Sequence, residues 1–251
     1  MKITHYLILA GIVPANAALL SDFDGGGLAY TEQAFRGAPV GTVVEGGPTG
    51  SYYNLLNNTG DAGNNIAFPA TGTAGWQTAA FSMDVRADRI QADGFGIGFI
   101  DVATHGNDLV RPGAGGFGDV EERYLASNSV GVGFRTFNGT NATVSYDGAQ
   151  SGDASYSLPA GEWVSVEVSM TRSGDGANIS ASIGGESVFT DYALAGAPDD
   201  FRIQIGGRTG GAAMDLDIDN VNLTTSQIIP EPSGALLAGL GLLALGARRK
   251  R

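Results

Sequence analysis

Val164-Ser165-Val166-Glu167-Val168-Ser169-Met170-Thr171 alternates apolar and polar residues without a break. Residues 81–88 and 214–219 show the same alternation, with Phe, Met, Val, Ala, Leu or Ile at every second position. Successive side chains of a strand point to opposite faces of a sheet. Each stretch therefore predicts a β-strand with one buried face and one solvated face.

Working outward from these stretches, the sequence predicts an all-β fold. Further strands are expected at residues 94–100, 129–137, 142–147, 178–183 and 201–206. No stretch of the middle of the chain shows a capped helical period. We therefore expect one domain over residues 18–227, built as an antiparallel jelly-roll sandwich. Residues 46–75 and 103–128 are expected to form long loops, where binding sites are often found.

The N-terminal end has the three parts of a signal peptide. Lys2 gives a positive start, Tyr6–Val13 is apolar, and Ala15-Asn16-Ala17 supplies the small-x-small pattern. Residues 1–17 are thus expected to form a signal helix that signal peptidase removes by cleavage after Ala17.

The C-terminal end, residues 228–251, reads as a short removable membrane tail. Pro230-Glu231-Pro232 precedes an apolar run over 234–247 and the basic end at 248–251. As a helix this run spans roughly 21 Å, short of the ~30 Å hydrocarbon core. We expect a short transmembrane helix that holds its basic end in the cytoplasm until it is cut off.

This tail resembles the PEP-CTERM sorting signal. The resemblance implies export in a Gram-negative cell, recognition by an exosortase and cleavage near Pro230, Glu231 and Pro232. The expected destination is the outer surface or the extracellular matrix, after a transient anchorage in the inner membrane.

The charge of the chain argues against one class of function, and its lack of cysteine excludes disulfides as a source of stability. The formal net charge is −12, and the ends hold five of the 14 basic residues but only Glu231 of the 26 acidic ones. The middle is therefore near −16 and contains no lysine. Such a domain repels phosphate backbones, so nucleic-acid binding is not expected. Cysteine is absent, so stability must come from the core, with a bound cation as an additional source.

The last predicted strand carries a possible cation site. Its apolar parity is even through Ile218 and odd at Val221, which predicts a β-bulge near Asp219. If the first and last strands pair, four carboxylates could gather around a Ca²⁺ ion, which binds six to eight oxygens. These metal candidates are Asp22, Asp24, Asp217 and Asp219. The common alternative is a set of solvated aspartates.

Glycine follows the same period of two in two other strands. Gly94, Gly96 and Gly98 alternate with large apolar residues, as do Gly131 and Gly133. If these strands are neighbours, their outer face is flat and open either to a ligand or to a covering loop.

Three motifs resemble the L-type lectins of the concanavalin A-like superfamily. They are Ala92-Asp93-Gly94-Phe95-Gly96-Ile97-Gly98-Phe99, Gly115-Gly116-Phe117-Gly118, and the strand over 129–138. The resemblance implies a lectin-like sandwich in which Asp93, Gly116 and Asn138 bind sugar. The family's metal-binding acids fall at Gly133 and Arg135 in this chain, so the resemblance does not extend to that metal site.

Little in the sequence indicates catalysis. Glu162 and Glu167 lie at odd spacing, hence on opposite strand faces, and cannot form the carboxylate pair of a glycosidase. His105 lies in a polar loop. Trp163, at the start of a strand, is expected in the core, whereas Trp76, among Gly and Thr, is the candidate sugar-stacking platform. We expect non-catalytic carbohydrate binding; the alternatives are a glycoside hydrolase or lyase, and a structural exopolymer component without a specific ligand.

Overall fold

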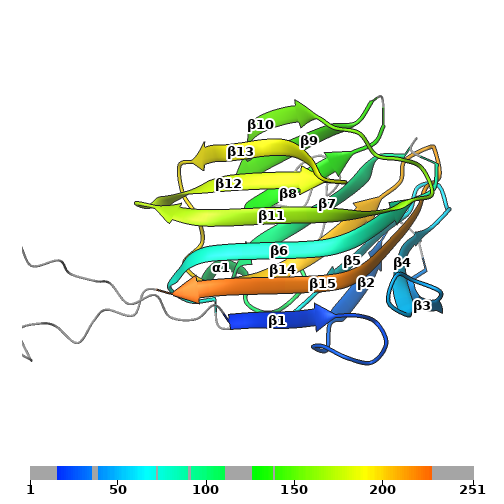
Figure 1. The fold of residues 1–251 in the computed structure, drawn as a ribbon, viewed down its shortest axis with the longest axis horizontal. Helices are drawn as coiled ribbons and strands as arrows, with labels where there is room; N and C mark the ends of the chain where they lie inside the picture. The colour runs from blue at the N-terminus through cyan, green and yellow to red at the C-terminus, as the bar shows by residue number, and fades with distance from the viewer. Residues whose placement is uncertain are drawn as a thin grey trace, which may run out of the picture.

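The structure is a computed structural model that describes residues 16–35, 39–71, 73–89, 92–110, 126–137 and 139–227. Within these residues, two antiparallel sheets pack face to face as a sandwich (Figure 1). The predicted all-β sandwich is confirmed. The expected N-terminal signal helix and C-terminal transmembrane helix lie outside the described residues.

The first sheet has eight strands in the order β13-β12-β11-β6-β15-β4-β3, with β1 pairing onto β15. Its strands are β1 (Asn16–Ser21), β3 (Thr42–Glu45), β4 (Ser51–Asn57), β6 (Trp76–Ala87), β11 (Trp163–Ser173), β12 (Gly176–Ile183), β13 (Glu186–Leu194) and β15 (Asp215–Gln227). The three alternating stretches that predicted strands all lie in this sheet, in β6, β11 and β15.

The second sheet has seven strands in the order β10-β9-β8-β7-β14-β5-β2. Its strands are β2 (Thr31–Phe35), β5 (Gly63–Ala67), β7 (Gly94–Asp101), β8 (Val130–Arg135), β9 (Asn141–Tyr146), β10 (Ala149–Ser155) and β14 (Phe201–Arg208). One helical turn, α1 (Val102–His105), follows β7 and is capped by Asp101, whose Oδ1 accepts from Thr104 N at 2.6 Å.

The prediction of one long loop over residues 46–75 is wrong, because strands β4 and β5 occupy much of this range. A register shift between β15 and β4 lets Leu55 and Leu56 both reach the core, which removes the period of two from the β4 sequence. In β5, Asn64 and Asn65 are almost fully buried although they are polar. Neither strand therefore carries the alternation that marks a half-buried strand.

A single apolar core fills the space between the sheets. Phe99 of β7 meets Phe81 of the facing sheet edge-on at 6.3 Å and Phe201 at 5.3 Å between ring centroids. Phe95 and Phe134 stack at 5.0 Å on neighbouring strands. All five rings are buried, and edge-to-face and offset pairs of this kind add to the burial of apolar area.

The glycine strands are neighbours, as expected, and their outer face is covered. Gly96 pairs with Gly133 and Gly98 with Gly131, and all four are buried. At the Asp101 end of this face, Ile100 packs against Val110 and Ala126 in a small second apolar cluster. Of the two alternatives, a covering loop is therefore the one the described residues show at this end.

Strand β15 connects the fold, because three strands pair with it (Figure 1). Strand β6 runs along one side, while the other side pairs first with β4 and then with β1. A register shift against β6 falls between Asp219 and Asn222, and Asn220 has φ 51°. The predicted bulge is confirmed, and the first and last strands do pair, which was the condition stated for the cation site.

Side chains of the bulge contact the turn between β3 and β4. The Thr49 hydroxyl lies 3.2 Å from Asp219 Oδ2 and 2.9 Å from Asn220 Oδ1, while Asn220 Nδ2 donates to Asp84 Oδ2 at 2.8 Å. The Asp219 side chain is fully buried, and this burial raises the pKa of its carboxyl group.

The strand directions give the sandwich two distinct ends. Asn16 pairs with Thr225, so β1 begins beside the end of β15; we call this end the terminal pole (Figure 1). At the other end, here called the distal pole, Arg208 pairs with Gly94, and a short connection leads from Arg208 to Asp215.

The raised pKa of Asp219 predicts a pH-dependent cost of keeping this carboxylate buried. A carboxyl whose folded pKa is raised contributes stability below its ordinary pKa of 3.8, and this contribution is lost as pH rises through the folded value. In Asp219→Asn, the unfolding free energy relative to wild type should therefore increase between pH 3.8 and neutral pH. Urea unfolding at several pH values measures this, with Asp175→Asn in an exposed turn as the control; a pH-independent difference would contradict it.

Candidate functional site at the distal pole

Asp93 lies at the distal pole, directly before β7. Its Oδ2 is 3.0 Å from the guanidinium of Arg208, and the two side chains are 16% and 18% exposed. Gly94 has φ +134°, and a Cβ there would clash with the carbonyl oxygen of Phe134. Glycine thus lets β7 and β8 close tightly, and Thr136 N donates to Asp93 O at 3.0 Å.

Two loops form the wall beside this carboxylate. The Thr209 hydroxyl donates to Thr59 O at 2.6 Å, and Asp61 N donates to Gly210 O at 2.6 Å. A Cβ at Gly210 would lie 3.0 Å from Asp93 Oδ2, so the loop backbone passes close to the acid. The result is a partly exposed carboxylate that is fixed by an arginine and flanked by loop backbone.

Of the predicted sugar-binding set, the structure places only Asp93. Gly116 and Asn138 lie outside the described residues, so their role stays a prediction. The sequence indicated no role for Arg208; it drew attention only to Arg135, at a position where the family has a metal-binding acid. Both arginines flank Gly94 by register, and Arg208 forms an ion pair with Asp93. The available signal was the polar alternation of Arg202, Gln204 and Arg208 along β14.

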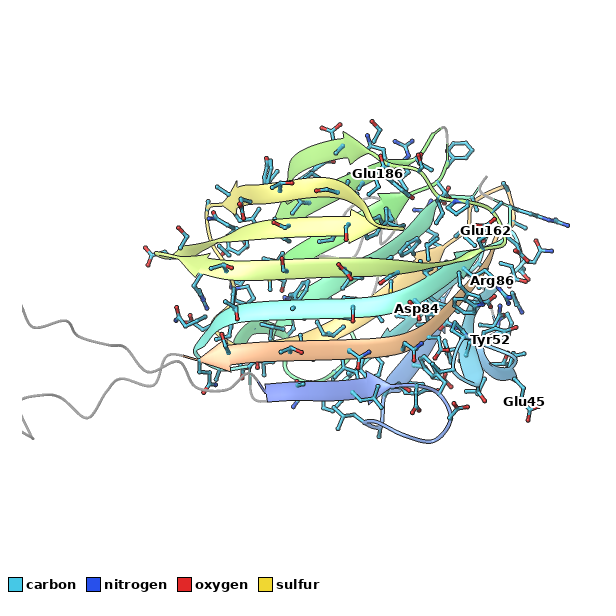
Figure 2. All side chains as sticks on the ribbon, viewed as in Figure 1. Glu45, Tyr52, Asp84, Arg86, Glu162 and Glu186 are labelled. Carbon is cyan, nitrogen blue, oxygen red and sulfur yellow. The ribbon has the colours of Figure 1, made fainter. Side chains whose placement is uncertain are left out.

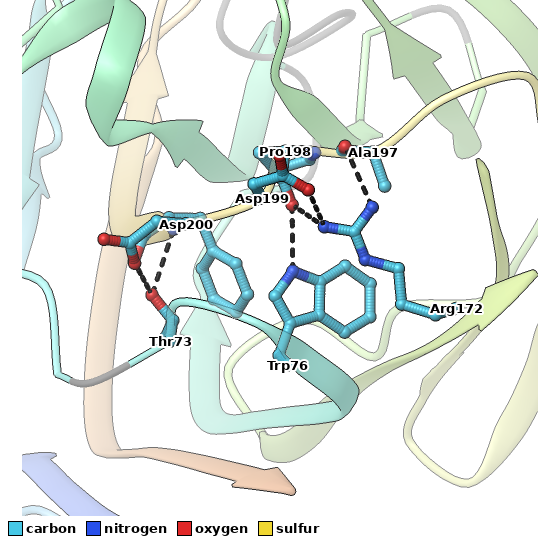
Figure 3. Close-up of polar contacts among 8 residues, drawn as sticks. Thr73, Trp76, Arg172, Ala197, Pro198, Asp199 and Asp200 are labelled. Carbon is cyan, nitrogen blue, oxygen red and sulfur yellow. Dashed lines mark hydrogen bonds and ion pairs between the residues drawn. The ribbon is translucent and has the colours of Figure 1, made fainter. Parts of the chain in front are cut away.

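The prediction that Trp76 is an exposed platform is wrong. Trp76 is completely buried, and its Nε1 donates to Pro198 O at 2.9 Å (Figure 3). The guanidinium of Arg172 lies 4.6 Å from the centre of its ring, and Phe201 meets it edge-on at 5.8 Å. The Gly and Thr residues around Trp76 suggested an exposed loop, but they form the turn that begins β6, and the segment before β14 packs over the ring.

Trp163 takes the opposite position to the one expected. It lies half-buried on the outer face of the eight-stranded sheet, not in the core. The Arg86 guanidinium lies 4.9 Å from the Trp163 ring centre and 5.1 Å from that of Tyr52. Figure 2 shows Arg86 and Tyr52 at the same end of the sandwich. Arg86 also donates to Asp217 Oδ2 from Nε at 2.9 Å and from a terminal nitrogen at 2.7 Å. The period of β11 places position 163 on the outer face with Ser165 and Glu167, so the expectation that a large aromatic residue enters the core was the wrong guide here.

The four aspartates proposed for Ca²⁺ are held by other partners. Asp217 pairs with Arg86 and accepts from Asn54 at 2.7 Å, and burial raises the pKa of its carboxyl group despite the arginine. Asp219 meets Thr49. Asp24 accepts from Ser51 N at 2.6 Å, and Asp22 accepts from two backbone N–H groups of its own loop at 3.1 Å.

Within the described ranges, no group of three or more His, Asp or Glu side chains could hold a metal ion. The predicted gathering of Asp22, Asp24, Asp217 and Asp219 at a cation is therefore wrong. The bulge does redirect Asp219, but toward a turn of the chain itself.

The predicted processing residues fall mostly beyond the described part of the chain. Ala15, Pro230, Glu231 and Pro232 lie outside it, whereas Ala17 is in β1 and pairs with Thr224. None of the helices in the described residues is both long and apolar enough to cross a membrane.

Comparison with known proteins identifies the C-terminal motif. The PEP-CTERM protein-sorting motif matches residues 229–251, as the sequence predicted. This motif implies processing by an exosortase and sorting to the cell surface. No curated protein matches the chain.

The sandwich resembles solved lectin structures at low sequence identity. Peanut lectin with a nine-residue peptide aligns with TM-score 0.60 and 15% identity, over 87% of this chain and 100% of that one. Lectin UEA-II complexed with galactose aligns with TM-score 0.58 and 12% identity, over 86% and 100%. The exoplasmic/lumenal domain of VIP36, in its metal-free form, gives 0.56 and 11%, over 86% and 92%. The chain thus joins a two-sheet antiparallel sandwich of the L-type lectin fold to a PEP-CTERM protein-sorting motif.

Proposed function

We propose that this protein is an exported surface or matrix protein whose sandwich binds carbohydrate without catalysis at the distal pole. The fold shared with lectins and the sorting motif support this proposal. Signal peptidase would remove residues 1–17, an exosortase would remove the tail within 228–251, and residues 18–227 would form the mature domain.

The observation that carries the proposal is the anchored carboxylate at the distal pole. A carboxylate accepts hydrogen bonds from sugar hydroxyls, and the guanidinium and nearby backbone N–H groups can donate to others. Arg208 holds Asp93 in place, so part of the ordering is complete before a ligand arrives. Gly116 and Asn138 would add a backbone donor and a side-chain amide.

The acids that hold metal in the lectin family are replaced here by Gly133 and Arg135, and the described residues form no alternative metal group. Structures of the VIP36 domain include Ca²⁺-bound forms. Gly133 offers no side-chain oxygen and Arg135 carries a positive charge, so neither residue suits a Ca²⁺ ion, which binds oxygen ligands. We therefore assign the ordering of Asp93 to Arg208, and no step depends on a metal.

The two ends of the described sandwich indicate how the domain would be oriented relative to the membrane. Both ends of the described sandwich, Asn16 and Gln227, lie at the terminal pole (Figure 1). A tail attached after Gln227 would hold this pole toward the membrane during sorting. Asp93 would then face away from the membrane, where extracellular polysaccharide is accessible.

Replacement of Asp93 tests the proposed site. Asp93→Asn keeps the side-chain shape but removes the ion pair and one charged acceptor, so glycan affinity should fall about tenfold to a hundredfold. A glycan array with the residue 18–227 protein identifies ligands, and titration calorimetry on positive glycans measures the affinity. Binding should persist in a metal chelator.

Asp175→Asn is the matched control, because it makes the same change in an exposed turn at the terminal pole. Unchanged binding by Asp93→Asn would refute the site. A blank array would favour a structural exopolymer component, and release of reducing sugar from a polysaccharide panel would favour the hydrolase alternative.

Processing is tested by the mass of the protein isolated from its native cells. We expect an N-terminus at Ala18 and loss of the residues after the Pro-Glu-Pro motif. Cleavage after Ala17 leaves Ala18–Ser21 of β1, and Ala18 still pairs with Leu223. The Glu231→Ala variant should keep its tail and remain in the membrane fraction. A cytosolic protein that keeps Met1 through Arg251 would contradict export.

A further inference from the structure

Signal-peptide cleavage at the predicted position would uncover part of the last strand, β15. The first two residues of β1, Asn16 and Ala17, pair with Thr225 and Thr224 of β15 (Figure 1). Cleavage after Ala17 removes both of them. The residue after Thr225 already lies beyond the pairing with β1, so this side of β15 would then be open over residues 224–226. We call this stretch the β15 edge.

The rest of the fold would keep both strands in place after the cut. On their other side, the two threonines of the edge pair with Ala79 and Ala80 of β6. In β1, Leu20 is only 1% exposed, whereas Ala17 is exposed. Loss of Ala17 therefore removes little packing and leaves β1 anchored. A strand that is paired on one side alone presents a row of N–H and C=O groups to any extended chain that approaches it.

The β15 edge lies close to the sorting motif along the chain. Pro230, which opens the Pro-Glu-Pro motif, follows three residues after Gln227, where β15 ends. Three residues span at most about 11 Å, which is about the diameter of a single helix with its side chains. An enzyme that binds the motif must therefore come within reach of the end of β15.

The chemistry of the β15 edge suits main-chain pairing with a partner. A strand added to an exposed sheet edge gains its affinity from backbone hydrogen bonds. Thr224 and Thr225 are β-branched, which favours a strand, and Ser226 is small and polar. None of the three carries a charge that would repel an incoming strand, although charges are a common protection of sheet edges.

We propose that the β15 edge, once signal-peptide cleavage has uncovered it, is the surface on which the exosortase docks, by pairing an extended segment of its own chain with residues 224–226. This inference rests on the proposed export and processing, and it adds a contact and an order to them. Until Asn16 and Ala17 are removed, β1 occupies the edge. Removal of the tail therefore follows removal of the signal peptide.

A short insertion that covers the edge again tests the proposal in the full-length protein. Asn-Thr-Thr inserted between Ala17 and Ala18 leaves the signal cleavage site unchanged. After cleavage, its two threonines take the places of Asn16 and Ala17 opposite β15. Tail removal should then slow about tenfold, because docking loses main-chain hydrogen bonding. Pulse–chase labelling in the native cells measures the rate, and mass spectrometry verifies the cut after Ala17.

An Asn-Pro-Pro insertion at the same place is the matched control. Hydrogen-bonded and non-hydrogen-bonded pairs alternate along an antiparallel ladder, so one of the two prolines must fall at a hydrogen-bonded position, where it has no N–H to donate. This variant should lose its tail at the wild-type rate. Hydrogen–deuterium exchange of the purified mature proteins should show slower exchange over residues 224–226 in the Asn-Thr-Thr variant alone.

The outcomes separate this inference from the proposed function. Equal rates of tail removal in the two insertion variants would overturn docking at the β15 edge and leave export and processing intact. A mature wild-type dimer that the Asn-Thr-Thr insertion abolishes would place a second copy of the chain on the edge and would also overturn it. A wild-type protein that keeps both of its ends would overturn the edge together with the proposed export.

Discussion

The pairing of β15 with three other strands is the constraint on which the sandwich depends. Strand β6 pairs along its length on one side, and the other side changes partner from β4 to β1 at the Asp219–Asn220 bulge. An extra residue is needed there, because a strand without it would turn the following side chains to the wrong face. At this irregularity β1 takes the place of β4 beside β15, and both ends of the described sandwich lie at the terminal pole.

The placement of the ends separates attachment from recognition. The terminal pole leads to the sorting motif, while the anchored Asp93 lies at the distal pole. Loops at strand ends carry most variation in such folds, since the paired strands that hold them tolerate little change. A protein sorted through its C-terminal end can therefore present these surfaces without altering its core.

Arginines take the role that a cation could have had in this acidic domain. Arg208 pairs with Asp93, Arg86 pairs with Asp217, and Arg202 donates to the backbone of the segment that follows α1. A planar guanidinium donates to carboxylate and carbonyl oxygens in a fixed geometry, which suits an ordering role. The middle of the chain has nine arginines and no lysine. Among the described residues, Arg86, Arg172, Arg202 and Arg208 lie at structural contacts.

Alternation along the chain determined the strands β6, β11 and β15, the bulge and the sandwich class, because a period of two reports directly which side is buried. The C-terminal end likewise revealed the sorting motif, because such a signal is recognised as a linear sequence. Only the tertiary structure decided which tryptophan is buried and which partner each aspartate has. Those outcomes depend on strands distant in sequence: Pro198 covers Trp76, Arg86 neutralises Asp217 and Arg208 reaches Asp93. Contacts between such segments are set by sheet order and register, which local patterns do not encode.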